Sequence, residues 1–426
     1  MRTYFWQNPK ARAQELLALD FGRQVAETFA VRVLLTIVSL ITTVLIARLL
    51  GPDGRGLYAV LMTIATVGVQ LGNLGFHSSN TYYVAQNRSL MPTLASNSLL
   101  LSAFAGGGCG LLAWTLFAAW PEVAPARGSV LLPALIWMPI GLAYLLLQNL
   151  LLGIQDVRAF NLIELATRLL GVGLIAIIVL LDLISVQQLF GAALIAVALG
   201  VVFLIWRISH HMSGWLPPSV GLIQENIRYG LKAYLSALCS FLVLRVDVFM
   251  VQHMLGNEQT GYYSIAVAMA DMVLMLPLVI GMLLFPKLTA MQNAEHKWSA
   301  TGRVLKLTGM SMAVLGVIAA LVAEPLVRML FGGEFSPAVP AFMWLIPGVV
   351  LLSINMILMN YFAAIGMPAI TVYSPLLATV VNVGLNIELI PHWGISGAAM
   401  ASTLAYGLML FASIIYLKKE KQKRQA

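Results

Sequence analysis

The sequence predicts an all-α integral membrane protein with about twelve transmembrane helices. Of its 426 residues, 60% are hydrophobic and only 10% are charged, and the mean hydropathy is +0.88, whereas a soluble domain carries about 25% charged residues. The apolar stretches run for roughly 20 residues without alternation, which indicates helices rather than barrel strands. The expected spans are 28–48, 57–80, 94–119, 129–152, 160–181, 187–207, 229–254, 262–285, 304–323, 338–362, 367–389 and 395–417.

The basic residues predict the orientation of these spans. Twelve spans place both chain ends on one side, and 18 of the 25 Lys and Arg residues lie on that side, against 4 on the other. An excess of basic residues marks the cytoplasmic side, so both termini are expected in the cytoplasm. Topology thus explains the net charge of +8, and we expect no nucleic-acid partner. Residues 1–26 lack a continuous apolar core, so the first span is expected to be an uncleaved signal anchor.

The two halves of the chain resemble each other. LGPDGRGLYAV from Leu50 matches LGNEQTGYYSI from Leu255 at an offset of 205 residues, and GAALIA from Gly191 matches GAAMAS from Gly397 at an offset of 206. Two six-helix repeats in the same orientation suit two bundles that rock about a central path. The expected divisions are a cytoplasmic segment at 1–27, a bundle at 28–212, a cytoplasmic linker at 213–228, a second bundle at 229–417 and a basic tail at 418–426.

The segment between the first two spans predicts a tight hairpin. It reads Gly-Pro-Asp-Gly-Arg-Gly at 51–56. Proline is expected to set the turn and the glycines to adopt positive φ.

Two long segments carry a family resemblance. ARLLGPDGRGLYAVLMTIATVGVQLGNLGF from Ala47 and RVDVFMVQHMLGNEQTGYYSIAVAMADMVLMLPLVIGMLLFPKL from Arg245 resemble Wzx-type polysaccharide flippases. These belong to the multidrug/oligosaccharidyl-lipid/polysaccharide exporter superfamily, together with the MATE exporters and the lipid II flippases. The resemblance implies a V-shaped pair of six-helix bundles in the bacterial inner membrane. It also implies movement of an undecaprenyl-pyrophosphate-linked oligosaccharide from the cytoplasmic to the periplasmic leaflet for surface polysaccharide biosynthesis.

The resemblance further implies coupling to a proton or sodium gradient and no bound cofactor. The expected partners are the lipid-linked oligosaccharide, membrane lipids and a polysaccharide polymerase. We expect no catalytic residues and no metal site, because no nucleophile–base pair or ligand-spaced cluster is visible in the sequence.

Ionisable residues inside the spans are the first site candidates, because they are costly there and usually functional. Arg245 and Asp247 lie deep in the seventh expected span, and Asp271 lies near the middle of the eighth. We expect Arg245 to hold pyrophosphate, and Asp247 or Asp271 to titrate or to bind a cation. The alternative is an ion pair between two helices.

Further candidates lie in other spans. Glu164 and Arg168 are four residues apart and can pair at the mouth of a cavity, and Arg32 either snorkels to the surface or faces the substrate headgroup. Over all these spans the three arginines balance three carboxylates, so protonation of one aspartate would favour anion binding. Asn149, Asn360 and Asn382 either line a sugar path or join helices by hydrogen bonds of about 0.6 kcal/mol each.

Two other functions stay open. A MATE-type ion-coupled exporter of small molecules would share the fold and the repeat, but would favour excess acid in its cavity. A membrane polysaccharide polymerase or ligase would need a substantial extracytoplasmic loop or a catalytic cluster, and the predicted loops are short.

Overall fold

The structure is a computed structural model that describes residues 9–126 and 128–425, with side chains from Ala30 onward except at 294, 421 and 423–425. The charges predicted in the segment 1–27 and at the end of the basic tail therefore lie outside the described side chains. The helices are α1 (Pro9–Gly72), α2 (Phe76–Gln86), α3 (Met91–Leu101), α4 (Gly107–Ala119), α5 (Leu132–Gly153), α6 (Val157–Leu180), α7 (Val186–Ser209), α8 (Val220–Val243), α9 (Val246–Leu255), α10 (Asn257–Ala290), α11 (Ala294–Leu330), α12 (Ala338–Ala364) and α13 (Ile370–Gln425).

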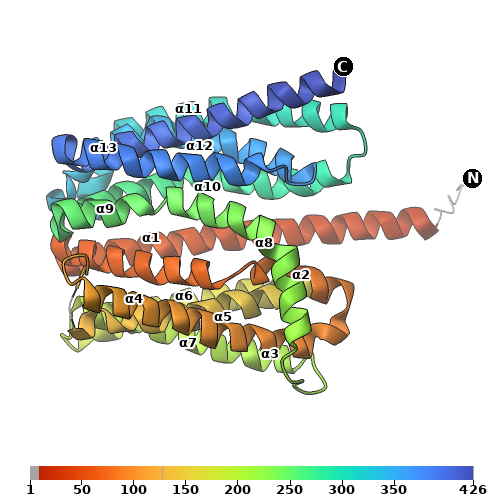
Figure 1. Cartoon of the computed structure of the whole chain (residues 1–426), viewed down its shortest axis with the longest axis horizontal. Helices are drawn as coiled ribbons and strands as arrows, with labels where there is room; N and C mark the ends of the chain where they lie inside the picture. Colours follow the sequence, from red (N-terminus) through yellow and green to blue (C-terminus); the bar gives the residue numbers. More distant parts are fainter. Residues whose placement is uncertain (1–8, 127, 426) are drawn as a thin grey trace, which may run out of the picture.

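Two of these helices each cross the membrane twice. The described residues contain ten helical segments that are long and apolar enough to cross a membrane, but Ala30–Gly72 has 43 residues and Ile370–Glu420 has 51, whereas about 20 suffice. Each reverses at one glycine, Gly51 (φ 65°) in α1 and Gly394 (φ 57°) in α13, and Figure 1 shows both reversals. The described chain therefore makes twelve crossings, as predicted.

The first hairpin is tighter than the sequence predicted. Only Gly51 has positive φ, and the second limb of α1 begins at Pro52, because proline is preorganised for the first turn of a helix. Gly54 and Gly56 are helical, so the expectation of positive φ there was wrong. The repeat-matched Gly256 has φ 85° and ψ −178°, close to the 65° and −178° of Gly51. The internal repeat is thus visible in the backbone conformation.

The helices form two groups, shown in Figure 1. The N-lobe consists of α1 to α7 and the C-lobe of α9 to α13, and α1 lies on the side of the N-lobe that faces the C-lobe. Both described chain ends lie on one side, which we call the terminus side, and the reversals of α1 and α13 lie on the opposite, hairpin side.

The two lobes are packed together on the hairpin side. One apolar core joins residues of both lobes there, including Ile46 and Leu61 from α1 and Phe342 from α12. Toward the terminus side, the N-lobe and the C-lobe have separate apolar clusters. The protein is therefore closed between the lobes on the hairpin side.

Repeat-matched glycines make the closest approach at this closure. A Cβ added to Gly56 would lie 1.7 Å from the carbonyl oxygen of Asn257, and one added to Gly261 would lie 1.9 Å from that of Pro52. Only glycine fits at such a contact between two backbones. Arg55 adds a hydrogen bond from its Nε to the hydroxyl of Ser264 on α10, 3.1 Å away.

Helix α8 contacts both lobes. In its first half Gly230 lies against Gly75, and the side chain of Asn226 donates a hydrogen bond to Asn80 in the N-lobe. In its second half Ser236 donates to the carbonyl of Thr371 in the C-lobe. Figure 1 shows α8 crossing from one group to the other. The helix begins at Val220, so the end of the segment expected to be a linker is helical.

Candidate functional site

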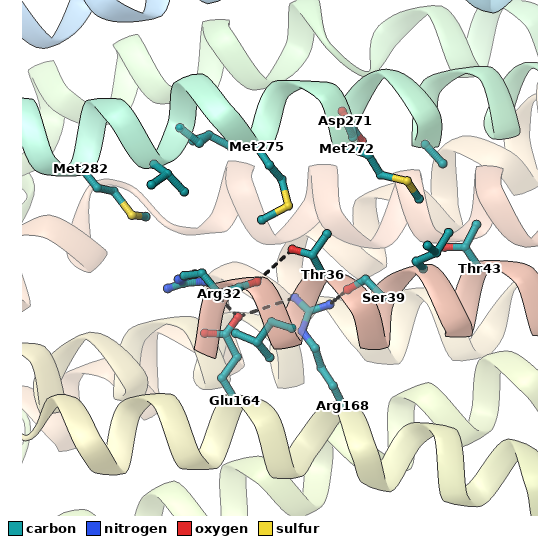
Figure 2. Close-up of a pocket in the computed structure, with 15 residues that line it drawn as sticks. Arg32, Thr36, Ser39, Thr43, Glu164, Arg168, Asp271, Met272, Met275 and Met282 are labelled. Carbon is teal, nitrogen blue, oxygen red and sulfur yellow. Dashed lines mark hydrogen bonds and ion pairs between the residues drawn. The ribbon is translucent and has the colours of Figure 1, made fainter. Parts of the chain in front are cut away.

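A cavity of about 400 Å³ lies where the first limb of α1, α6 and α10 face one another. The N-lobe supplies one wall and the C-lobe the other (Figure 2). The N-lobe wall consists of Arg32, Leu35, Thr36, Ser39, Leu40, Thr43, Glu164 and Arg168. The C-lobe wall consists of Ala268, Asp271, Met272, Met275, Leu278, Val279 and Met282. The cavity therefore lies on the path that the repeat predicted between two bundles.

A cluster of three charged side chains stands on the N-lobe wall. Glu164 accepts a hydrogen bond from Arg32 at 3.3 Å, and its Oε1 lies 3.6 Å from the guanidinium of Arg168. Arg168 also donates to the hydroxyl of Ser39 at 2.7 Å. The predicted pairing of Glu164 with Arg168 is present, and Arg32 joins it from α1. Two guanidinium groups share one carboxylate, so the cluster carries one net positive charge.

Two polar atoms of this cluster are left over. Within the described part of the chain, the buried Nε of Arg32 and Oε2 of Glu164 have no hydrogen-bond partner. An unpaired buried donor is costly. A bound anion that accepted a hydrogen bond from the Nε of Arg32 would remove this cost.

The only carboxylate among the described residues of the C-lobe wall belongs to Asp271. Its Oδ2 accepts a hydrogen bond from Arg245 at 2.8 Å. Arg245 lies at the break between α8 and α9, where φ is −133° and ψ is −18°. This is the ion pair between two helices that was given as the alternative to a binding role. Arg245 is not itself a lining residue and lies behind Asp271.

Asp247 is buried and is not among the residues that line the cavity. Only 1% of it is exposed, and its carboxylate accepts hydrogen bonds from the hydroxyls of Tyr263 and Ser402 and from the backbone N–H of Val248. The expected charge balance counted Asp247, which is not among the lining residues. Among the described residues, the lining side chains together with Arg245 carry one net positive charge.

The three asparagines predicted for the sugar path lie outside the cavity lining. Asn149 and Asn360 each donate to the carbonyl four residues before them, that of Leu145 and of Met356. Asn382 is fully buried and donates to Ser402 in the network of Asp247. Asn382 thus joins the two limbs of α13, and the backbone carbonyl of Asn149 accepts a hydrogen bond from Thr81 on α2, whereas the bond of Asn360 stays within α12.

None of the neutral lining residues was predicted from the sequence. Thr36, Ser39 and Thr43 follow Arg32 at intervals of four, three and four residues, which places all four on one face of a helix. A polar stripe at this spacing in an otherwise apolar span was the signal that could have identified them.

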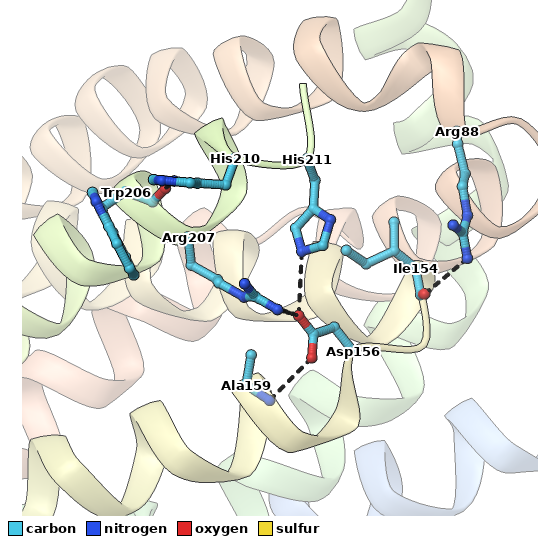
Figure 3. Close-up of polar contacts among 8 residues, drawn as sticks. All are labelled: Arg88, Ile154, Asp156, Ala159, Trp206, Arg207, His210 and His211. Atoms are coloured by element: carbon cyan, nitrogen blue, oxygen red, sulfur yellow. Dashed lines mark hydrogen bonds and ion pairs between the residues drawn. The ribbon is translucent and has the colours of Figure 1, made fainter. Parts of the chain in front are cut away.

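A second polar cluster fastens the loops of the N-lobe on the terminus side (Figure 3). Asp156 precedes α6 and accepts a hydrogen bond from the backbone N–H of Ala159 at 3.2 Å. Its carboxylate also accepts from Nε of Arg207 at 3.0 Å and contacts the ring of His211 at 3.2 Å. Burial raises the pKa of Asp156, but the hydrogen bonds from Arg207, Ala159 and His211 outweigh it and hold the pKa below its ordinary value.

Replacing Asp156 by asparagine is expected to lower stability in a pH-dependent way. A pKa that is lower in the folded state stabilises the fold above the ordinary pKa, and this contribution is lost as the pH falls through the folded value. Asp156→Asn keeps the cap of α6 but loses the charged hydrogen bonds, so we expect a loss of about 1–2 kcal/mol at pH 7. Thermal midpoints in detergent should differ at pH 7, and the difference should shrink as the pH falls below the ordinary carboxyl pKa of 3.8. The exposed Asp182→Asn is the control, and a loss that does not change with pH would contradict the prediction.

Comparisons with known proteins agree with this architecture. The polysaccharide biosynthesis protein family matches residues 45–340. A probable low-salt glycan biosynthesis flippase of Haloferax volcanii is 21% identical over 222 residues, which cover 51% of this chain and 47% of that protein. The chain spans less than half the length of the curated relatives it matches.

Two solved structures share the fold. The lipid II flippase MurJ in an inward closed conformation matches with a TM-score of 0.74 at 14% identity, over 91% of this chain and 87% of that one. A MATE family multidrug transporter of the MOP superfamily in an inward-facing conformation matches with a TM-score of 0.72 at 17% identity, over 91% and 94%. The predicted fold, shared with MATE exporters and lipid II flippases, is confirmed. The two solved proteins are named as a flippase and a transporter rather than as enzymes.

Proposed function

We propose, because this chain belongs to the polysaccharide biosynthesis protein family, that it flips an undecaprenyl-pyrophosphate-linked oligosaccharide across the membrane by alternating access. Most of the basic residues lie on the terminus side, which assigns that side to the cytoplasm. The cargo then moves from the cytoplasmic to the periplasmic leaflet of a bacterial inner membrane. A polysaccharide polymerase would then use the delivered cargo.

The observation that carries this proposal is the excess positive charge of a cavity between two lobes. Arg32 and Arg168 face one carboxylate, Glu164, and Asp271 is already neutralised by Arg245. Guanidinium groups bind phosphate oxygens through paired, charge-assisted hydrogen bonds. The lobes are closed on the hairpin side, so this charge is offered to a ligand that arrives from the terminus side.

The same charge argues against the main alternative. An exporter of cationic small molecules would lower its affinity for cargo by presenting two arginines in the cavity. A polymerase or ligase has less support, because the matched relatives are named as flippases and transporters.

Removal of Arg32 is expected to weaken anion binding. Arg32→Gln leaves Glu164 paired with Arg168, so the wall loses its net charge and its free donor. We expect at least about a 10-fold loss of affinity for inorganic pyrophosphate, as for one charge-assisted hydrogen bond. Calorimetry on the purified full chain in nanodiscs measures this. Arg328→Gln is the matched control, because Arg328 also pairs with a glutamate, Glu324, but on the exposed surface. Unchanged affinity in Arg32→Gln would contradict the assigned site.

The cargo itself is tested in cells. Deletion of the gene is expected to remove surface polysaccharide and to accumulate a lipid-linked oligosaccharide in the cytoplasmic leaflet, whose sugars identify the glycan. Unchanged lipid-linked pools together with greater sensitivity to cationic drugs would support the small-molecule exporter instead.

A further inference from the structure

We propose that the methionine-lined wall of α10 binds the hydrocarbon chain of the transported lipid where it adjoins the pyrophosphate, while the opposite wall binds the polar part. This inference rests on the proposed function. It assigns the two walls of one cavity to the two chemically different parts of one cargo.

The walls differ sharply in polarity. Six of the eight lining side chains from α1 and α6 are polar or charged, against one of the seven from α10. That one, Asp271, already accepts a hydrogen bond from Arg245. The α10 wall therefore offers almost no free donor or acceptor to a ligand, whereas the N-lobe wall offers several.

Three methionines form a stripe along α10. Met272, Met275 and Met282 are separated by three and seven residues and lie on one helix face, with Leu278 and Val279 between them. At 1.5 Å per residue the stripe is about 15 Å long. Met282 is 51% exposed, and Figure 2 shows Met275 and Met282 extending toward the limb of α1 that carries Arg32 and Thr36.

The chemistry of this stripe favours hydrocarbon over sugar. A sugar hydroxyl pressed against thioether and methyl groups would lose its hydrogen bonds to water without replacement. The lining residues that the structure describes include no aromatic side chain on which a sugar ring could stack. Methionine is flexible and polarisable, so it adapts to an apolar chain that has no fixed shape.

The charge on the opposite wall indicates which chemical group the hydrocarbon chain carries. The polar wall directly opposite carries Arg32 and Arg168, which together exceed the charge of Glu164. A ligand that satisfies both walls at once has an apolar chain attached to an anionic group. A prenyl pyrophosphate has this composition, and a free glycan or a neutral lipid does not.

Binding of two probes to the purified full chain in nanodiscs tests the proposal. Inorganic pyrophosphate reports the anion site alone, and farnesyl pyrophosphate reports the anion site and the apolar wall. We expect farnesyl pyrophosphate to bind at least about 10-fold more tightly after subtraction of its binding to empty nanodiscs. The triple variant Met272→Gln, Met275→Gln and Met282→Gln should abolish this ratio and leave pyrophosphate affinity unchanged within about 2-fold. Met310→Gln with Met329→Gln, on the exposed face of α11, is the matched control.

Methyl spectra of the wild-type protein give a test that does not depend on a variant. With ¹³C-labelled methionine methyl groups, farnesyl pyrophosphate should shift the resonances of Met272, Met275 and Met282 and leave Met310 unmoved. If the wild type binds neither probe, the anion site and with it the proposed function fail. If it binds both probes equally, or if the methionine resonances do not respond, the present inference fails while the proposed function stands.

Discussion

A single methyl group added at Gly56 is expected to abolish transport by preventing closure on the hairpin side. The Cβ of Gly56→Ala would lie 1.7 Å from the backbone oxygen of Asn257, and neither backbone can yield without separating the lobes. Overpacking of this kind costs about 2 kcal/mol or more, which shifts the equilibrium about 30-fold toward the state that is open on the hairpin side. In alternating access, a protein that cannot close on one side cannot complete its cycle.

Distances between the lobes distinguish this result from simple misfolding. Spin labels placed on the two lobes at the hairpin side should report a longer separation in Gly56→Ala, while the yield and the elution profile stay normal. Gly261→Ala should act in the same way, because its Cβ would meet the backbone of Pro52 at 1.9 Å. Gly108→Ala is the control, since a Cβ there meets nothing within 4 Å. Transport by Gly56→Ala at the wild-type rate would show that this contact is not part of the cycle.

Replacement of Asp247 by asparagine is expected to uncouple transport from the ion gradient. The carboxylate is fully buried and accepts three hydrogen bonds, two of them from the hydroxyls of Tyr263 and Ser402. These contacts join α9 to α10 and α13, so a change of charge at Asp247 is felt by three helices of the C-lobe. We expect Asp247→Asn to lose at least about 10-fold in rate, the effect of one lost hydrogen bond to a charged group.

The decisive measurement is the dependence of flipping on an imposed gradient in proteoliposomes. Wild-type transport should rise with a proton or sodium gradient, and Asp247→Asn should not respond to either. Glu258→Gln is a matched control, because Glu258 accepts a hydrogen bond from the hydroxyl of Tyr262 at 2.7 Å but is exposed. A variant at Asp247 that keeps the wild-type response would show that the coupling group lies elsewhere.

The order of the spans could be predicted from the sequence because each apolar run must cross the same thickness of bilayer. The repeat-matched glycines Gly51 and Gly256 likewise predicted the two hairpins. The sequence could not predict toward which neighbouring helix each side chain points. Arg245 and Asp247 are two residues apart, yet one contacts the cavity wall through Asp271 and the other faces Ser402 inside the C-lobe.

Polar spacing in an apolar helix was more informative than charge alone. Asn382 was predicted as a candidate for the sugar path. It accepts a hydrogen bond from Asn386 four residues later, but Ser402, to which it donates, comes from the other limb of α13 and cannot be predicted from the local pattern. The stripe that includes Thr36 and Ser39 could have been read directly, because its side chains share one face of one helix. The methionine wall could not, since only packing decides which face of α10 meets the other lobe.

The contact of the two hairpins has the symmetry of an isologous dimer interface, in which the same patch meets its own copy. Pro52 and Asn257 are repeat-equivalent, as are Gly56 and Gly261, and each glycine meets the equivalent residue of the other half. A six-helix ancestor pairing with itself would make this contact twice with one set of residues. The two halves differ at this contact: Arg55 contacts Ser264 of the other half, while the repeat counterpart of Arg55 is Thr260. The interface therefore buries one guanidinium group, whereas a dimer of two identical halves would bury two.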